Sequence, residues 1–201
     1  KENYRNDILK LTILPTMNCN CNCYYCYETH HGKRISKEVV DNIKNYIKSN
    51  IRHIKHLHID WFGGEPLLET EAIRDISGFS LTVCREEKIG FSANITTNAF
   101  FLDFANCRLL KDAGIKEIHV TIDGSKKMHD RIRITKKQEE TFDLIVNNIR
   151  SFVEYDEGNS ALIRIHLHSL EDEELEGIID TMMLFEEYKD RVSFYFRDLF
   201  S

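Results

Sequence analysis

Residues 117–123 read Glu-Ile-His-Val-Thr-Ile-Asp, and this stretch decides the fold because its side chains alternate strictly between polar and apolar. Successive side chains of a β-strand point to opposite faces of the sheet. A strand covered by helices on both faces would instead be apolar almost throughout. The stretch therefore predicts a sheet whose apolar face carries helices and whose polar face lines a lumen that holds a polar ligand. The same alternation occurs in residues 56–61, 93–98 and 163–168.

Short β-type runs alternate with amphipathic helical patterns along the whole chain. This order, with right-handed crossovers, is typical of a parallel sheet or a barrel. Six strands are too few for a closed eight-stranded barrel, so the sequence predicts an α/β fold, an open and partial (β/α)6 TIM-like barrel. An antiparallel sheet with one wet face is the alternative, and the intervening helices disfavour it. The predicted strands cover residues 8–16, 55–62, 91–97, 116–122, 162–168 and 191–197. The predicted helices cover residues 36–50, 69–88, 102–113, 138–155 and 171–189.

Two helix ends and one helix face carry local signals. Ser36 is a good N-cap residue, and Val39, Ile43 and Ile47 form one apolar stripe behind it. Gly114 follows the third helical pattern, where a C-terminal glycine is expected. The acidic run 171–176 is interpreted as a solvated first helical turn, favoured by the helix dipole.

Composition narrows the class of protein. The 201 residues are 42% hydrophobic and 30% charged, which suits a soluble globular domain. No stretch approaches the roughly 20 apolar residues that cross a bilayer, so no membrane partner is expected. A net charge of -6 lacks the basic footprint of a nucleic-acid-binding protein. Six cysteines without an export signal argue against a disulfide framework.

Four of the six cysteines lie between positions 19 and 26, in the loop after the first predicted strand. Cys19, Cys23 and Cys26 show the spacing C-x3-C-x2-C. Three thiolates on a short loop can hold three irons of a cubane cluster, which leaves the fourth iron open for a ligand. Loops after the strands form the active-site face of an α/β barrel, so this loop is expected at the functional end of the sheet.

Two other interpretations of the cysteine loop stay open. A structural zinc site needs four ligands, and His30 and His31 are available to complete such a set. The pair Cys23 and Cys26 also has the spacing of a redox motif, although such motifs usually open a helix in a thioredoxin-like context.

The loop resembles the C-x3-C-x2-C signature of the radical S-adenosylmethionine (SAM) superfamily. Asparagine after the first cysteine and Tyr-Cys-Tyr at the end are similar to the subgroup whose members carry a SPASM or twitch domain. The resemblance implies that Cys19, Cys23 and Cys26 ligate a 4Fe–4S cluster, and that Cys21 is a bystander. It also implies that residues 1–201 form one radical SAM barrel, and that the C-terminal auxiliary-cluster domain of the subgroup is absent from this chain.

Further motifs occur in the order that the family has. Residues 62–66, Phe-Gly-Gly-Glu-Pro, follow the second predicted strand and match the GGEP motif. Glycines let backbone approach a ligand closely, and a glutamate accepts hydrogen bonds from an ammonium group. Residues 96–98, Thr-Thr-Asn, resemble the family's Thr-Asn-Gly, with Ala99 in place of the glycine. The resemblance implies that Gly63, Gly64, Glu65 and Pro66 of the GGEP motif bind SAM at its methionine amino group. It also implies that Asn98 contacts SAM.

The stretch from 121 to 133 is similar to the Ser-x-Asp-Gly…His-Asp-x-x-Arg run of peptide-modifying members. That similarity implies that Thr121 and Arg133 bind the SAM carboxylate, for which a guanidinium fork is well suited. Tyr25 matches a position whose backbone meets the adenine. His166 shares a strand face with Arg164 and His168 and is expected to contact cofactor, ribose or substrate.

The resemblance implies an enzyme that reductively cleaves SAM to a 5′-deoxyadenosyl radical, which abstracts a hydrogen atom from the substrate. Modification of a ribosomally made peptide is the favoured reaction. An anaerobic sulfatase-maturating enzyme, which forms formylglycine, or a non-catalytic module stabilised by a cluster or zinc, is the alternative. The expected partners are a peptide or protein substrate and an electron donor such as flavodoxin or ferredoxin. Because the cluster needs a reducing setting, a cytoplasmic location follows.

Overall fold

A computed structural model describes residues 7–29 and 32–198. Six strands form one sheet in the order β1-β2-β3-β4-β5-β6, and every neighbouring pair is parallel. In the part of the chain that the structure describes, β1 and β6 are not paired with each other, so the barrel is open, as the sequence predicts. The parallel pairing rules out the antiparallel alternative. The strands are β1 Ile8–Ile13, β2 His56–Trp61, β3 Gly90–Thr97, β4 Ile115–Ile122, β5 Ser160–Leu167 and β6 Val192–Asp198.

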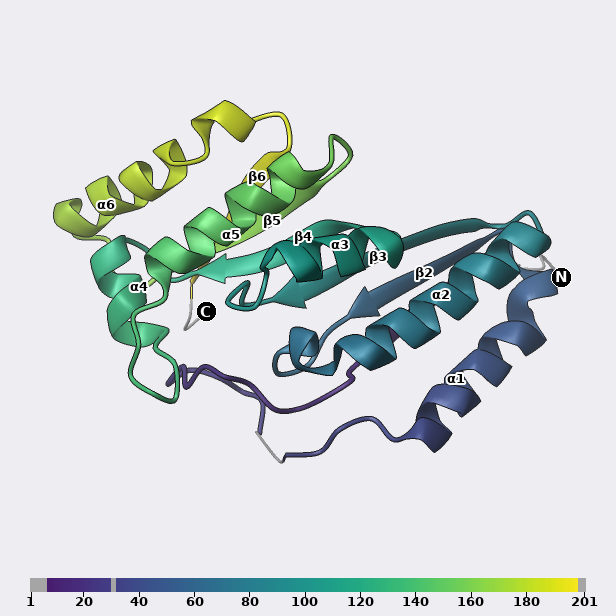
Figure 1. Cartoon of the computed structure of the whole chain (residues 1–201). Helices are drawn as coiled ribbons and strands as arrows, with labels where there is room; N and C mark the ends of the chain where they lie inside the picture. The colour runs from purple at the N-terminus through teal and green to yellow at the C-terminus, as the bar shows by residue number, and fades with distance from the viewer. Residues whose placement is uncertain (1–6, 30–31, 199–201) are drawn as a thin grey trace, which may run out of the picture.

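Helices connect successive strands and cover the apolar face of the sheet (Figure 1). Buried isoleucines of β2 to β5 pack there against buried residues of the helices, and Cys84 and Cys107 belong to this core, as expected of small buried hydrophobes. The helices are α1 Lys37–Asn50, α2 Thr70–Glu86, α3 Phe104–Asp112, α4 Lys126–Ile132, α5 Phe142–Tyr155 and α6 Asp172–Met183. Short 3-10 turns occupy Ile51–His53, Pro66–Glu69 and Glu186–Tyr188.

The first predicted strand is too long at its carboxyl end. Strand β1 ends at Ile13, three residues before the predicted limit. Pro15 has no N–H to offer a neighbouring strand, and its carbonyl instead accepts a hydrogen bond from Ile35 N at 2.7 Å. Thr16 then forms an isolated antiparallel bridge with Arg34. The chain therefore leaves the sheet early and pairs with the segment that leads into α1.

Three helix predictions need correction. The buried stripe of α1 contains Val40 and Ile47, while Val39 is exposed. Helix α4 was not predicted, although Ser125 caps it by accepting a hydrogen bond from Met128 N at 3.2 Å. Helix α6 ends at Met183, six residues early, and a short 3-10 turn follows. Ser36 does cap α1, with Oγ accepting from Val39 N at 3.2 Å, and Gly114 ends α3 at a φ of 71°.

The arrowheads of β2, β3 and β4 point toward the side where the purple cysteine loop and α4 lie (Figure 1). Because the strands are parallel, the loops that follow them gather at this one edge. The residues implicated by the sequence motifs lie at this edge or just beyond it.

Candidate active site

The cysteine loop is held at the carboxyl edge of the sheet by a distant segment. Asn22 N donates to Ile134 O at 3.1 Å, and Lys136 N donates to Asn20 O at 2.8 Å. Cys21 and Thr135 form the isolated antiparallel bridge between these two bonds. The stretch that follows α4 therefore fixes the backbone of the loop, although no sequence motif covers that stretch.

The four cysteines of the loop differ in environment. Cys21 is buried, Cys19 and Cys23 are half-buried, and Cys26 is exposed. The thiol–thiol hydrogen bond with Cys19, together with burial, raises the pKa of Cys21 and keeps it protonated. Burial also raises the pKa of Cys23, while the guanidinium of Arg133 opposes this rise.

The residues present fit a cluster held by three thiolates. Charges on Cys19 and Cys26 raise the pKa of Cys23, so the three side chains lie within electrostatic reach of one another. No disulfide joins any of the six cysteines, all of which the structure describes. Thiolate sulfurs are the usual ligands of iron–sulfur clusters. Ligation by this set of three stays a prediction, and His30 and His31, the extra ligands of the zinc alternative, lie outside the described residues.

The two glycines of the GGEP motif bring two backbones together. Gly64 N donates to Thr16 O at 3.0 Å, and Glu65 N donates to Asn18 O at 2.7 Å. A Cβ on Gly64 would lie 2.2 Å from Asn18 O, which is too close for any side chain. Gly63 has a φ of 113°, in the region that favours glycine. The glycines thus seat the cysteine loop against β2, and the close approach to a ligand expected from them stays a prediction.

The carboxylate of Glu65 is enclosed and faces donors of the chain itself. Its oxygens accept hydrogen bonds from Leu67 N at 2.9 Å, from Thr97 Oγ1 at 2.8 Å and from Asn98 N at 2.8 Å. Burial raises the pKa of Glu65 to about 7, although these hydrogen bonds oppose the rise. Glu65 therefore joins the end of β2 to the end of β3, and Pro66 begins the short turn behind it. Contact of Glu65 with a ligand ammonium stays a prediction.

Asn98 connects the end of β3 to the cysteine loop. Its Nδ2 lies 2.7 Å from Asn20 Oδ1, 3.5 Å from Cys19 Sγ and 3.4 Å from Cys21 Sγ. The next residue, Ala99, has a φ of 59°, which explains why the related motif has glycine here. The structure therefore places Asn98 beside the cysteines, closer to the expected cluster than the sequence alone indicates.

Asp123 is the centre of a buried polar network that sequence reasoning missed. Its Oδ2 accepts hydrogen bonds from Tyr25 Oη at 2.8 Å and from Arg133 Nε at 2.9 Å. Its Oδ1 lies 2.9 Å from His166 Nδ1 and 3.1 Å from His168 Nε2. Burial alone would raise the pKa of Asp123, but the Arg133 guanidinium and the histidine hydrogen bonds hold it well below its usual value. The alternation of β4 places Asp123 on the lumen face, which was the available signal.

The network unites three of the predicted site residues. Tyr25, Arg133 and His166 all contact Asp123, and the Tyr25 hydroxyl also contacts the Arg133 guanidinium. Thr121 lies two residues earlier on the same face of β4, half-buried. The structure thus brings Thr121 and Arg133 to one end of one strand, and their contact with a SAM carboxylate stays a prediction.

Asp123, His166 and His168 together also have the composition of a metal site, since their ligand atoms lie within 4.8 Å of one another. The buried guanidinium of Arg133 already balances the charge of Asp123. A second cation there would meet electrostatic repulsion from Arg133, so the trio is interpreted as a hydrogen-bonded network.

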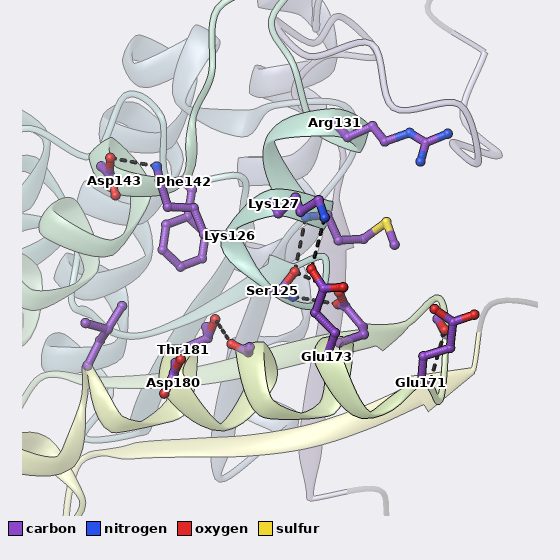
Figure 2. Close-up of a pocket in the computed structure, with 15 residues that line it drawn as sticks. Ser125, Lys126, Lys127, Arg131, Phe142, Asp143, Glu171, Glu173, Asp180 and Thr181 are labelled. Atoms are coloured by element: carbon purple, nitrogen blue, oxygen red, sulfur yellow. Dashed lines mark hydrogen bonds and ion pairs between the residues drawn. The ribbon is translucent and has the colours of Figure 1, made fainter.

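A pocket of about 560 Å³ lies between α4 and α6 (Figure 2). Its two lysines, Lys126 and Lys127, form ion pairs with acidic side chains of the pocket wall. Lys127 Nζ lies 3.0 Å from Glu173 Oε1, and Lys126 Nζ lies 2.7 Å from Asp143 Oδ2.

The acidic run 171–176 is not wholly solvated, contrary to the expectation from the sequence, because Glu174, which lines this pocket, is buried. Glu174 is buried, and its carboxylate accepts hydrogen bonds from Ser125 N and from Ser125 Oγ, each at 2.7 Å. It thereby anchors the turn that follows Asp123. Gly124 in this turn has a φ of 71°, and a Cβ there would lie 2.1 Å from Glu174 Oε1.

Among the residues that the structure describes, no helix combines the length and apolar character needed to cross a membrane.

The fold and the site define an α/β protein with a cysteine loop at the carboxyl edge of an open parallel sheet. A family model described as the Radical SAM superfamily matches residues 13–182, and the chain belongs to this family. The family uses a 4Fe–4S cluster and SAM, the two cofactors that the sequence predicts.

Curated relatives carry a different activity from the one favoured on sequence. The chain is 30% identical over 128 residues to a "Probable GTP 3',8-cyclase" of Methanococcus maripaludis, a match that covers 61% of this chain and 39% of the relative. It is 29% identical over 125 residues to a GTP 3',8-cyclase of Listeria monocytogenes, covering 59% and 34%. The chain thus spans well under half the length of these relatives. The matches support a radical SAM enzyme and do not show the SPASM subgroup or peptide maturation.

Solved structures share the fold. Native anSMEcpe with bound AdoMet superposes with a TM-score of 0.78 at 18% identity, covering 96% of this chain and 52% of that chain. SuiB of Streptococcus suis bound to S-adenosylmethionine gives a TM-score of 0.60 at 20% identity, covering 95% and 39%. These likenesses confirm the partial radical SAM barrel.

Proposed function

We propose that this chain is the SAM-binding and radical-forming part of an enzyme that modifies a peptide. The observation that carries the proposal is the convergence of two groups at one edge of the sheet. The loop with Cys19, Cys23 and Cys26 meets the buried pair of Asp123 and Arg133 through Tyr25. A cluster ligand set and a cation suited to a carboxylate thus adjoin each other, as a cluster-bound amino acid requires.

When bound, the reduced cluster would supply one electron to the sulfonium of SAM, and breakage of the C5′–S bond would give methionine and a 5′-deoxyadenosyl radical for hydrogen-atom abstraction from the substrate. The side chains of this protein hold and orient these groups. In the proposal, Cys19, Cys23 and Cys26 ligate iron. Arg133 and Thr121 bind the SAM carboxylate, and Asp123 and Tyr25 fix the guanidinium of Arg133 in place. Flavodoxin or ferredoxin is the proposed electron donor.

The remaining predicted contacts surround these anchors. The backbone at Gly63 and Gly64 binds the SAM ammonium, the enclosed Glu65 carboxylate holds this segment against the end of β3, and Pro66 fixes the turn behind it. The Tyr25 backbone meets the adenine, and His166 faces the ribose or the substrate. Asn98, whose Nδ2 lies 3.5 Å from Cys19 Sγ, contacts SAM beside the cysteines in this proposal.

The polar face of the sheet supports a peptide over an anionic nucleotide. Lys10 Nζ lies 2.8 Å from Asp60 Oδ2, and His119 Nε2 lies 2.6 Å from Glu117 Oε1. The Lys10 ammonium is thus paired with an acid of the same face, which leaves less positive charge for a triphosphate. Two structural neighbours, anSMEcpe and SuiB, are described with bound peptides at TM-scores of 0.77 and 0.60.

GTP 3',8-cyclisation is the second candidate, because the curated relatives that match this chain carry that name. Sulfatase maturation is a peptide-modifying variant of the first candidate.

The first experiment tests radical formation. The protein is reconstituted anaerobically with iron and sulfide, reduced with dithionite, and assayed for 5′-deoxyadenosine from SAM. We expect 5′-deoxyadenosine from the wild type, loss of it in Cys23→Ala, and retention in Cys84→Ala, whose cysteine lies in α2. Equal product from the wild type and Cys23→Ala would refute the proposal.

The second experiment tests substrate class. The rate of 5′-deoxyadenosine formation is compared with GTP, with a cysteine- or serine-containing peptide, and with neither. Stimulation by the peptide alone supports peptide modification. Stimulation by GTP alone, with a cyclised product, establishes the second candidate instead.

A further inference from the structure

The orientation of the Asn20 side chain is fixed by a chain of hydrogen bonds. Phe100 N donates to Asn98 Oδ1 at 2.9 Å, which directs Asn98 Nδ2 toward the cysteine loop. Asn98 Nδ2 then donates to Asn20 Oδ1 at 2.7 Å. Because the acceptor end of the Asn20 amide faces Asn98, its donor end, Nδ2, points elsewhere.

That donor end is buried and unsatisfied. Among the residues that the structure describes, Asn20 Nδ2 has no hydrogen-bond partner. A buried donor without a partner costs about 1–3 kcal/mol, and native proteins rarely leave one without a reason. The neighbouring residue is Cys19, whose sulfur already accepts hydrogen bonds from Cys21 N at 3.4 Å and from Asn98 Nδ2 at 3.5 Å.

We propose that Asn20 Nδ2 donates a hydrogen bond to a sulfur of the cluster and raises its reduction potential. The inference rests on the proposed function, because it requires a cluster on the cysteine loop. Asn98 acts as the positioning residue that aims the Asn20 amide. Backbone N of Asn98 is in turn held by Glu65 Oε2 at 2.8 Å, so the GGEP segment supports the arrangement.

The direction of the effect follows from charge. The reduced cluster carries one more negative charge than the oxidised cluster, so an N–H dipole aimed at sulfur stabilises the reduced form more. Hydrogen bonds to the sulfurs are one of the factors that set cluster potentials. Removing this donor therefore makes the cluster harder to reduce.

The test is a redox titration of the reconstituted full chain, followed by EPR of the reduced cluster at pH 8 without SAM. Asn20→Leu removes the donor at similar volume. Asn20→Asp keeps an oxygen that accepts the hydrogen bond from Asn98 Nδ2 and replaces the amide donor by a carboxylate oxygen. The contact between position 20 and Asn98 is therefore retained in this variant. Asn22→Ala is the matched control, since Asn22 lies two residues away with an exposed side chain. We expect a lower midpoint potential in both Asn20 variants and an unchanged midpoint in Asn22→Ala.

Measurement of the iron and sulfide content distinguishes a failure of the hydrogen-bond inference from a failure of the proposed function. If Asn20 were merely structural, Asn20→Leu would lower the amount of cluster and leave the potential of the assembled clusters unchanged. Asn20→Asp also adds a negative charge that lowers the potential by itself, so the lower midpoint of Asn20→Leu is the result that supports the hydrogen bond. A wild-type midpoint in either Asn20 variant overturns the inference while the proposed function stands. Absence of a cluster in the wild type overturns the proposed function itself.

Discussion

Asp123 accepts hydrogen bonds from Tyr25, Arg133 and two histidines, and both it and Arg133 are buried. We expect Asp123→Asn to lower the free energy of unfolding by about 3–5 kcal/mol, because it leaves the Arg133 guanidinium buried without its counter-charge. Urea denaturation of the cluster-free protein measures this change.

A surface pair provides the control for that experiment. Lys127 and Glu173 form an ion pair in which both side chains are more than 80% exposed. Because solvent screens such pairs, Glu173→Gln should leave the urea midpoint unchanged. Equal effects of Asp123→Asn and Glu173→Gln on the free energy of unfolding would show that the buried pair of Asp123 and Arg133 stabilises the protein no more than an exposed ion pair.

Glu65 should make stability depend on pH. Its pKa rises to about 7 in the folded protein from 4.5 as a free group, so the folded state binds the proton more tightly than the unfolded state. The linked stabilisation is complete below the unfolded pKa and is lost as pH rises toward 7. We expect the unfolding free energy of Glu65→Gln, relative to the wild type, to increase by roughly 2–3 kcal/mol between pH 5 and pH 8.

Urea titrations of both proteins at several pH values test this expectation. Other titrating groups, including Asp123, are common to the two proteins and cancel in the difference. A difference that stays constant between pH 5 and pH 8 would mean that Glu65 is ionised in the folded state throughout.

For individual residues, the sequence predicted which side chains lie in the candidate site but not which partners they contact. Strand alternation placed Asp123 on the lumen face, and motif order placed Arg133 and Tyr25 near it. The pairing of Arg133 with Asp123, and the enclosure of Glu65 by backbone donors, depend on loop paths that have no period in the sequence. Those contacts arise only from the three-dimensional packing of distant segments.

Between elements, Gly64 is the contact point of the cysteine loop and the end of β2. We expect Gly64→Ala to lower the free energy of unfolding by about 1–3 kcal/mol, because its Cβ would overlap the Asn18 carbonyl oxygen. The displaced loop should also bind less iron. Urea denaturation and iron analysis check the two effects.

Gly78 is the matched control, because a Cβ there meets nothing within 4 Å. It lies inside α2, where alanine is favoured over glycine by about 0.5–1 kcal/mol. Gly78→Ala should therefore stabilise the protein and leave iron binding unchanged. Opposite signs in the two variants would confirm that Gly64 acts through its contact with Asn18 and not through backbone entropy.

Helix α6 supports the site through Glu174, which holds the turn after Asp123. We expect Glu174→Ala to lower the free energy of unfolding by about 1.5–3 kcal/mol, because two hydrogen bonds to a buried carboxylate are lost. Glu176→Ala, at an exposed position of the same helix, is the control. Equal urea midpoints for the two variants would contradict an anchoring role.

The order of strands and helices was predictable, but several of their limits were not. Apolar periodicity located five of the six helices, because each buries a stripe on the sheet. Helix α4 is short, and its composition Lys-Lys-Met-His-Asp-Arg-Ile lacks such a stripe. The capping residue Ser125 was its main signal. Strand β1 ends early because the chain at Pro15 pairs with the segment before α1 instead of with β2. Hydrophobic periodicity does not indicate such a change of pairing partner.

For the molecule as a whole, the order of strand and helix patterns and the number of strands correctly predicted an open parallel barrel, and the polar alternation within the strands predicted one face covered by helices. We expect cluster assembly to stabilise this fold, because a ligand that binds only the folded state raises stability by mass action. Reconstituted protein should have a higher thermal midpoint than the cluster-free protein, and chelation of the iron should reverse the gain.

Hydrogen exchange locates that stabilisation. Added protection is expected in residues 14–29 and in the facing segment 134–139, with little change in α2. Cys23→Ala, treated with iron and sulfide in the same way, should show no gain. A uniform gain along the chain, or the same gain in Cys23→Ala, would contradict site-specific assembly.

The bridge between Cys21 and Thr135 joins positions more than a hundred residues apart. During synthesis, which proceeds at roughly 5–20 residues per second, the cysteines therefore leave the ribosome several seconds before the segment that holds their loop. Until residues 134–136 emerge, the thiols lie on an unsupported chain and are open to oxidation or to the wrong metal. The order of the sequence thus makes correct metal loading a late event, and a nascent chain stalled before Ile134 should bind iron poorly.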